Sequence, residues 1–282
     1  YELCHYRGMG MSSYKILLVI IFSMLLGNSV VVLAADYDKG VRAVQADDYE
    51  TALAEWTPLA EQGHAKAQSN LGRMYSDGIG VPKNHKTAVM WYTKAAEQGD
   101  AFGQTMLGYM YDNGQGVPEN DKTAVMWYTK AAEQGDAFGQ TMLGIMYDNG
   151  EGVLENDKTA VMWYTKAAEQ QGEWLAQINL GKMYANGGGV PKNDKTAVKW
   201  YTKAAEEGNA YAQYNLGKMY SNGDGVLTDY VRAYMWYNLG AYNGNKLGAE
   251  NKTKLAKEMT SSQIAKAQEM SSRCLESGYT DC

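Results

Sequence analysis

The sequence predicts an all-α fold, a solenoid in which antiparallel helix pairs stack side by side. Three observations support this prediction. Tryptophan recurs along the chain at spacings of 35, 36, 36, 37 and 36 residues. A Leu-Gly pair followed by Met-Tyr recurs five times at the same period, and so does a short glycine turn such as NGQGV. Only 4 prolines accompany 31 glycines, which suits helices joined by tight turns.

Residues 1–35 are predicted to precede the mature protein. The residues before Met9 read as an upstream extension, so that translation starts at Met9 or Met11. Lys15 then leads into an apolar run that ends in two alanines, as in a secretory signal peptide. The run approaches the ~20 residues that span a bilayer, so an uncleaved anchor is the alternative. We therefore expect a periplasmic or secreted protein, or one anchored to the inner membrane by this segment.

Residues 64–245 are expected to form five repeats of two helices each. In AFGQTMLGYMY, small and apolar residues stand at i, i+3, i+4, i+7 and i+8, starting from Gly103. In KTAVMWYTKAAEQ they do the same, starting from Ala124. This spacing places one apolar stripe on each helix, and each stripe is buried against the next helix.

The helix ends and the turns between helices have their own signals. Asn120 or Asp121 is expected to cap the second helix of its repeat, and Gly135 to end it. Between the two helices, a pair of glycines one residue apart permits positive φ twice, which folds the helices back on each other. The recurring tryptophans are expected to be core residues between repeats, not ligand contacts. They are Trp56, Trp91, Trp127, Trp163, Trp200 and Trp236.

The pattern LGxMYxxGxGVxxNxxxAxxWYxKAAxxG resembles the Sel1-like repeat, a relative of the tetratricopeptide repeat with a longer loop between its helices. It recurs in register five times, from about Gly63 to Gly240. Before it, residues 36–63 resemble a tetratricopeptide-like helix pair. The resemblance, closest to exported bacterial members, implies a right-handed α/α superhelix whose first helices line a concave face. It does not imply one activity.

Residues 246–282 are expected to form capping helices that cover the last apolar face. Thr260 and Gln263 fit a capping box at the start of the final helix. Cys274 and Cys282 are the only cysteines after the predicted signal segment. Two cysteines near the end of an exported chain are expected to pair as a disulfide, with two free thiols as the alternative.

The composition and motifs argue against several classes of function. A net charge of −6 excludes general nucleic-acid binding, which needs a basic surface. Some secreted members of the resembled family are linked to penicillin binding, but the S-x-x-K match at Ser12 lies in the signal segment, and no K-T-G follows. The turn DNGQGVPENDK lacks the order of a calcium loop. We therefore expect no enzyme activity, no cofactor and no metal.

The resemblance places the ligand groove on the first helices, around each Leu-Gly pair. Along the solenoid this predicts a basic entrance, an aromatic and aliphatic middle and a second basic pair. Apolar side chains on such a face indicate a partner, and cations beside them suit its carboxylates. The alternative is a covering face that binds nothing specific. The predicted groove residues are Arg73, Phe102, Thr105, Tyr109, Asp112, Phe138, Thr141, Ile145, Asp148, Ile178, Lys182, Tyr211, Tyr214 and Lys218.

The sequence thus predicts an exported, monomeric scaffold whose concave groove binds another protein or an extended peptide. It binds a membrane only if the N-terminal apolar segment is uncleaved. Two alternatives remain open at this stage. One is a cell-envelope enzyme of a β-lactamase or peptidoglycan-related type, and the other is a membrane-tethered structural protein.

Overall fold

The computed structural model of the chain describes residues 35–170 and 172–282. Within them it contains fourteen helices and no strand. The predicted signal segment lies outside the described residues. None of the described helices combines the length and the apolar character that crossing a membrane requires. The helices are α2 (Tyr37–Gln45), α3 (Tyr49–Glu61), α4 (Ala65–Asp77), α5 (His85–Glu97), α6 (Ala101–Asp112), α7 (Asp121–Glu133), α8 (Ala137–Asn149), α9 (Asp157–Ala168), α10 (Trp174–Asn186), α11 (Asp194–Glu206), α12 (Ala210–Asn222), α13 (Tyr230–Tyr242), α14 (Lys246–Leu255) and α15 (Ser261–Glu276).

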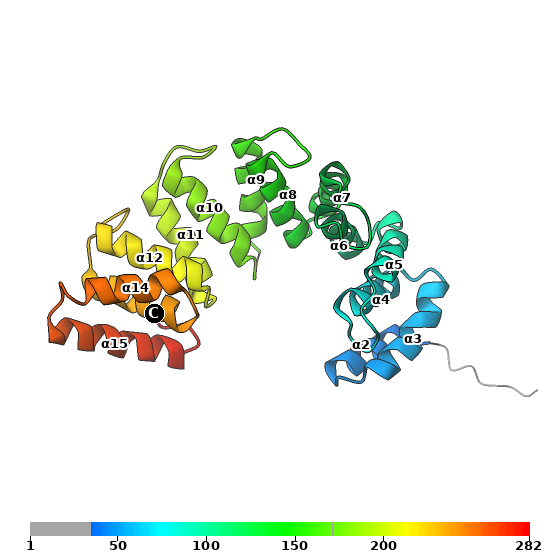
Figure 1. Cartoon of the computed structure of the whole chain (residues 1–282), viewed down its shortest axis with the longest axis horizontal. Coiled ribbons are helices and arrows are strands. Elements are labelled where there is room, and N and C mark those ends of the chain that lie inside the picture. The colour runs from blue at the N-terminus through cyan, green and yellow to red at the C-terminus, as the bar shows by residue number, and fades with distance from the viewer. Residues whose placement is uncertain (1–34, 171) are drawn as a thin grey trace, which may run out of the picture.

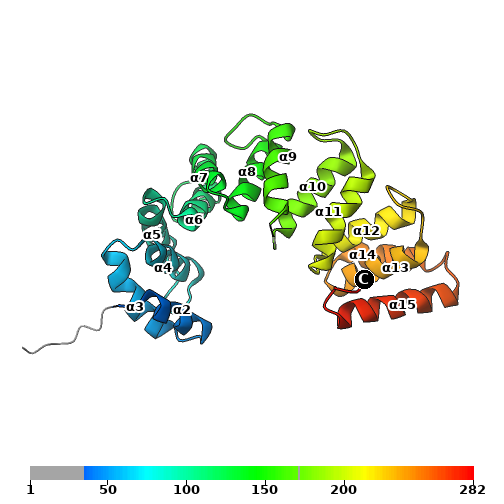
Figure 2. The same cartoon turned by 180° about the vertical axis from the view of Figure 1, so that it is seen from behind.

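The helices stack as antiparallel pairs into an open arc, with α2 and α15 at its two ends (Figures 1 and 2). Each helix from α2 to α13 packs against the next one along the chain. In both views α4, α6 and α8 lie on the inner side of the arc and α5, α7 and α9 on the outer side. First helices of successive repeats also touch each other, as α4 touches α6 and α8 touches α10. The predicted all-α solenoid is confirmed.

The helix ends form as the capping signals indicate. Asn120, and not Asp121, is the N-cap of α7, and its side-chain oxygen accepts a hydrogen bond from the backbone N–H of Thr123 at 3.0 Å. After α7, Gly135 has φ +89° and turns the chain. At the start of α15, Thr260 and Gln263 form the predicted capping box. Each cap satisfies backbone groups that the helix itself leaves unpaired.

Both glycines of the inter-helix turn are needed for its conformation, and the second is also needed for packing. Gly114 and Gly116 both have positive φ, +62° and +76°. A Cβ on Gly116 would lie 2.5 Å from the carbonyl of His85, the first residue of α5 in the preceding repeat. The second glycine therefore lets the turn lie directly on the neighbouring repeat, where no side chain fits.

A buried glutamine in four of the five first helices ties neighbouring helices together. The Gln104 side-chain NH₂ donates to the carbonyl of Ala96 on α5 at 3.1 Å, and its oxygen accepts from the Gln134 side chain at 2.7 Å. This one side chain therefore connects two successive repeats. Its donor and acceptor are both satisfied, as burial requires. Gln68, Gln140 and Gln213 make the corresponding bonds.

In the middle repeats the fully buried aromatic residue is the tyrosine beside each tryptophan. Tyr128 is 0% exposed and packs on Gly108, where a Cβ would come within 2.8 Å of its ring. Trp127 is only half-buried, and the Lys130 ammonium lies 4.2 Å from a centroid of its ring system. Trp163 is arranged in the same way. The predicted tryptophan core therefore holds at Trp56, Trp91, Trp200 and Trp236, whereas Trp127 and Trp163 pack against the core only at its edge.

The C-terminal helices cover the second helix of the fifth repeat. Both α14 and α15 pack on α13, where Met235 is fully buried. The structure pairs Cys274 with Cys282, their Cα atoms 4.7 Å apart. Between the two cysteines, the Tyr279 hydroxyl and the Asn243 amide exchange hydrogen bonds of 2.8 and 3.0 Å. The cysteine pair therefore holds a short segment against the end of the solenoid.

Gly116→Ala is expected to destabilise the protein more than Gly135→Ala. Both glycines have positive φ, which costs an alanine about 1–2 kcal/mol. At Gly135 the new Cβ has free space, whereas at Gly116 it meets backbone 2.5 Å away. Urea unfolding followed by circular dichroism gives the comparison. Equal loss of stability in the two variants would contradict the close packing of the turn on the preceding repeat.

Cys282→Ser is expected to lower the free energy of unfolding by about 2.5 kcal/mol, because a disulfide closes a short loop in the unfolded chain. Adding a reductant should bring the native protein to the stability of the variant and leave the variant unchanged. A protein mass that shows two free thiols, with no effect of reductant on stability, would contradict a disulfide.

Candidate functional site: the concave face

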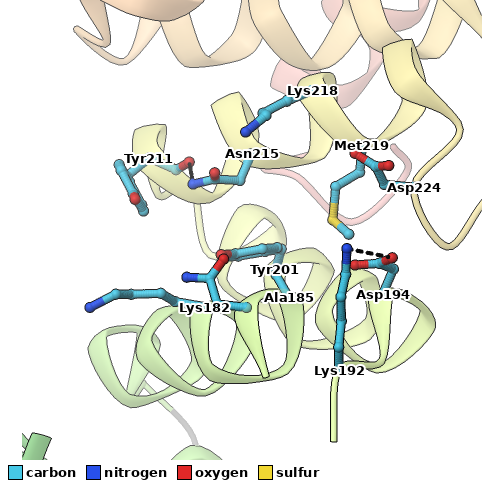
Figure 3. A pocket seen from close by; sticks show the side chains of 11 residues that line it. Lys182, Ala185, Lys192, Asp194, Tyr201, Tyr211, Asn215, Lys218, Met219 and Asp224 are labelled. Carbon is cyan, nitrogen blue, oxygen red and sulfur yellow. Dashed lines mark hydrogen bonds and ion pairs between the residues drawn. The ribbon is translucent and has the colours of Figure 1, made fainter. Parts of the chain in front are cut away.

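A cavity of about 380 Å³ lies between α10 and α12 and contains three of the predicted groove residues. Lys182 comes from α10, and Tyr211 and Lys218 come from α12 (Figure 3). Asn215 stands between the last two, one helical turn from each, and also lines the cavity. The structure therefore brings the second predicted basic pair together with an aromatic ring and an amide.

The cations of this cavity are unequally neutralised. The Lys182 ammonium lies 3.7 Å from the Asp148 carboxylate, and that of Lys192 lies 3.4 Å from Asp194. Among the described residues, no carboxylate lies within ion-pair distance of Lys218. In Figure 3 the Lys218 ammonium points toward Asn215. An incoming carboxylate therefore meets a cation that has no partner of its own.

A second cavity of about 380 Å³ lies nearer the middle of the arc. It is lined by Met106 and Tyr109 from α6 and by Phe138 from α8, together with polar residues of α4, α5 and the α6–α7 turn. Phe138 is exposed, with 37% of its surface accessible to solvent. Phe102, the same residue one repeat earlier, is 39% accessible and packs edge-on against Tyr92. The predicted apolar middle is therefore open to solvent.

A third cavity of about 410 Å³ lies at the N-terminal end, between α2 and α4. Its walls include Val41, Trp56 and Met74, and Arg73 lies among its lining residues. The Arg73 guanidinium is 3.7 Å from the Asp77 carboxylate, and both side chains are largely exposed. This is the predicted basic entrance, next to an apolar cavity.

Two aspartates lie at the inner ends of the middle repeats. Asp112 accepts a hydrogen bond from the buried Tyr128 hydroxyl at 3.2 Å, and Asp148 accepts one from Tyr164 at 3.4 Å. Burial raises the pKa of the Asp112 carboxyl, and the hydrogen bond from Tyr128 opposes this only in part. Burial and the nearby carboxylate also raise the pKa of Tyr128, so its phenol stays protonated as a donor.

Three of the predicted groove residues do not face the groove. Thr105, Thr141 and Ile178 are buried, at 1%, 0% and 6% exposure. From these positions in the first helix the side chains point toward the next repeat. There the Thr105 hydroxyl donates to Asp136, the N-cap of α8, at 2.7 Å. Their assignment to the groove is therefore corrected: they belong to the packing between repeats.

The remaining predicted residues are exposed or half-buried. Ile145 and Tyr214 are half-buried and pack partly into the core. The sequence-based prediction missed one position that faces the groove, the sixth residue of each first helix. Helical spacing could have found it, because Met106 stands four residues after Phe102 and three before Tyr109. These residues are Asn70, Met106, Met142, Asn179 and Asn215.

The candidate metal ligands among the described residues do not gather into a cluster. The His64 ring caps α4 by accepting from the backbone N–H of Ala67 at 3.2 Å, and it stacks on Tyr37. No group of three or more histidine, cysteine, aspartate or glutamate side chains within residues 35–170 and 172–282 is arranged to hold a metal ion. The concave face presents aromatic rings, amides, cations and two aspartates.

The model of the Sel1 repeat family matches the five repeats of the solenoid at residues 65–100, 101–136, 137–172, 174–209 and 210–245. This chain belongs to the Sel1 repeat family. Members of this family are typically scaffolds for protein interaction and are generally not catalytic. No curated protein matches the chain.

The chain is also similar to several solved structures. A Sel1 repeat protein from Oxalobacter formigenes is 35% identical, with a TM-score of 0.74, over 87% of this chain and 97% of that one. The protective antigen c5321 of uropathogenic Escherichia coli, described as displaying an SLR fold, is 30% identical over 86% of this chain and 69% of its own, with a TM-score of 0.38. A putative sel1 repeat protein from Klebsiella pneumoniae is 24% identical over 71% of this chain and 97% of its own, with a TM-score of 0.48.

Asp112→Asn is expected to make the stability of the protein change less with pH above about pH 4, the ordinary pKa of an aspartate. The pKa of Asp112 is raised on folding, so the folded protein holds this proton to higher pH than the unfolded chain does. Its contribution is therefore complete at low pH and is lost as the pH rises through the folded-state pKa. Urea midpoints measured from about pH 4 to about pH 7 should fall less in the variant. If the urea midpoint changed with pH identically in the variant and the native protein, the raised pKa of Asp112 would be contradicted.

Proposed function

We propose that this Sel1 repeat protein is an exported scaffold that binds an extended peptide segment of a partner protein along its concave face. The observation that carries the proposal is the cavity between α10 and α12, where Lys182, Tyr211 and Lys218 converge from two repeats. A single repeat does not provide this site, because its walls come from two successive first helices. Binding there therefore needs the stacked solenoid.

The size and chemistry of the three cavities favour a peptide over one large ligand. Each has a volume of about 380–410 Å³, near the lower end for small-molecule sites. They are distributed along the arc and are lined by different side chains. A peptide that places one or two of its side chains in each cavity occupies all three cavities, and its backbone runs along the concave face.

Export is proposed from the N-terminal sequence and from the pairing of Cys274 with Cys282, which suits an oxidising compartment. The monomeric state is proposed because α14 and α15 already cover the last repeat. N-terminal sequencing of the protein recovered outside the cytoplasm distinguishes a cleaved, soluble scaffold from a tethered structural protein. A chain that keeps its apolar segment would contradict the soluble form.

The peptide-binding function is tested by selection from a random peptide display library on the purified protein. We expect recovery of peptides whose binding is lost, by tenfold or more, in a variant with Tyr109→Ala, Lys182→Glu and Lys218→Glu. Lys158→Glu, on the outer helix α9, is the matched control and should bind the same peptides normally. The three lysines are exposed, whereas Tyr109 is half-buried against the core, so both variants should remain folded and only the triple variant should melt at a lower temperature. Failure to recover any peptide with this dependence would contradict the function.

A further inference from the structure

The buried tyrosine of each second helix packs on the glycine of the Leu-Gly pair in the first helix of its repeat. In the second repeat Tyr128 packs on Gly108, and its hydroxyl donates to Asp112 at 3.2 Å. In the third repeat Tyr164 donates in the same way to Asp148 at 3.4 Å. In both repeats the carboxylate stands four residues after the glycine. A carboxylate of the chain itself therefore satisfies the buried phenol.

The fourth repeat lacks that carboxylate. Its tyrosine, Tyr201, is only 4% exposed and packs on Gly181, where a Cβ would lie 2.9 Å from the ring. Four residues after this glycine stands Ala185, whereas the first and fifth repeats have serine there. The Tyr201 hydroxyl has no hydrogen-bond partner among the described residues. The Tyr92 hydroxyl of the first repeat also lacks one, but it is fully enclosed by the chain.

The place left by the missing carboxylate lies at the cavity between α10 and α12. Both Tyr201 and Ala185 line this cavity. In Figure 3 the Tyr201 side chain lies between Lys182 on one wall and Asn215 and Lys218 on the other. A buried hydroxyl without a partner loses the hydrogen bond that it makes to water in the unfolded chain. A group that enters this cavity can restore that bond.

The charged side chains of the cavity leave one cation for a ligand. Lys182 and Lys192 lie 3.7 and 3.4 Å from aspartate carboxylates. The lining carboxylate of Asp224 accepts a hydrogen bond from the Asn222 amide at 3.1 Å. No carboxylate of the described chain lies within ion-pair distance of Lys218. Its ammonium is carried on a flexible stem, so it can follow an anion that enters the cavity.

A phenol and an ammonium together favour a carboxylate over a neutral acceptor. Burial raises the pKa of Tyr201, so its hydroxyl stays protonated at neutral pH and can donate. A carboxylate only accepts hydrogen bonds, and those made to a charged group are stronger than those between neutral groups. An amide oxygen could accept from the phenol but would leave Lys218 without a counter-charge. The two donors therefore favour glutamate over glutamine.

We infer that the cavity between α10 and α12 binds an acidic side chain of the bound peptide, whose carboxylate accepts a hydrogen bond from the Tyr201 hydroxyl and pairs with the Lys218 ammonium. The ligand carboxylate takes the place that an aspartate of the chain has in the second and third repeats. It is assigned to a side chain because the group that satisfies the tyrosine in those repeats is also a side-chain carboxylate. This inference rests on the proposed peptide-binding function and names the group recognised at this cavity.

Blocked glutamate, the N-acetyl N-methylamide of the amino acid, tests the site without a peptide. The purified protein with isotope-labelled tyrosine rings is titrated and followed by NMR, with blocked glutamine as the neutral control. We expect glutamate to shift the ring signals of Tyr201 in a saturable way and to leave those of Tyr128 in place. Glutamine should bind at least about tenfold more weakly. Absence of a saturable shift at Tyr201, or equal binding of the two compounds, would overturn the inference.

Ala185→Asp supplies the missing carboxylate from the chain itself. Without ligand, the Tyr201 signals of this variant should lie near their positions in the native protein saturated with blocked glutamate, and adding the compound should shift them no further. Ala185→Ser adds a hydroxyl without a charge, leaves Lys218 unpaired and should still bind. If Ala185→Asp bound blocked glutamate as the native protein does, the inference would be wrong.

Peptides from the library selection test the same contact in the full ligand. Each acidic residue of a selected peptide is replaced by its amide, and the affinities are measured by calorimetric titration. One replacement should weaken binding to the native protein about tenfold and change little in Tyr201→Phe or Lys218→Gln, which already lack the contact. Tyr128→Phe, the matched control, should be less stable but keep the tenfold effect. A replacement that costs the same in all four proteins would contradict the assignment.

These experiments separate the inference from the function on which it rests. Recovery of groove-dependent peptides whose binding needs no acidic residue would overturn the inference and leave the peptide-binding function standing. A saturable shift at Tyr201 with blocked glutamate, together with a library that yields no peptide, would contradict the peptide-binding function and leave the carboxylate site standing.

Discussion

The close contact between the first helix of each repeat and the second helix of the repeat before it determines both the shape and the surface of this protein. At this contact the backbones approach so closely that a Cβ on Gly103 would lie 2.8 Å from that of Ala95. Across this contact the side chain of the buried Gln104 donates to the carbonyl of Ala96. The Thr105 hydroxyl donates to Asp136, the N-cap of the first helix of the next repeat. Because the same contact recurs, stability is close to a sum of like interfaces. A change at one such contact would therefore weaken that interface and leave the others as they are.

The same contact leaves the inner positions of each first helix free to vary. Residues 99–134 and 135–170 differ at only three positions. One of them, Tyr109 against Ile145, lies on the concave face, while the packing residues are identical. Further along, lysine and asparagine replace apolar residues at the same inner positions without changing the helix pair. Under the proposed function, recognition depends on a few side chains per repeat, while the interface that holds the repeats is kept.

The recurring pattern was sufficient to predict the helix pairs, the caps and the turns, because local periodicity and glycine conformation decide them. It was insufficient for details that depend on how two repeats meet. Thr105 was placed in the groove because helical spacing alone does not show which neighbour faces it, and the next repeat's Asp136 buries it. The glutamine bridges were missed because a polar residue in an apolar stripe gives no signal until its two partners are known. Trp127 was taken as core, although the smaller Tyr128 fits over Gly108.

The central claim is that one repeat is the unit of both stability and recognition, and deletion of residues 101–136 tests it most directly. Asp100 then precedes Ala137, so the joint reproduces the native sequence around each first helix. The account predicts a folded, less stable solenoid that lacks the cavity formed by Met106, Tyr109 and Phe138. Peptides that the native protein binds through Tyr109 should bind the deletion variant at least tenfold more weakly, as measured by calorimetric titration. A folded deletion variant that binds these peptides as tightly as the native protein would contradict the account.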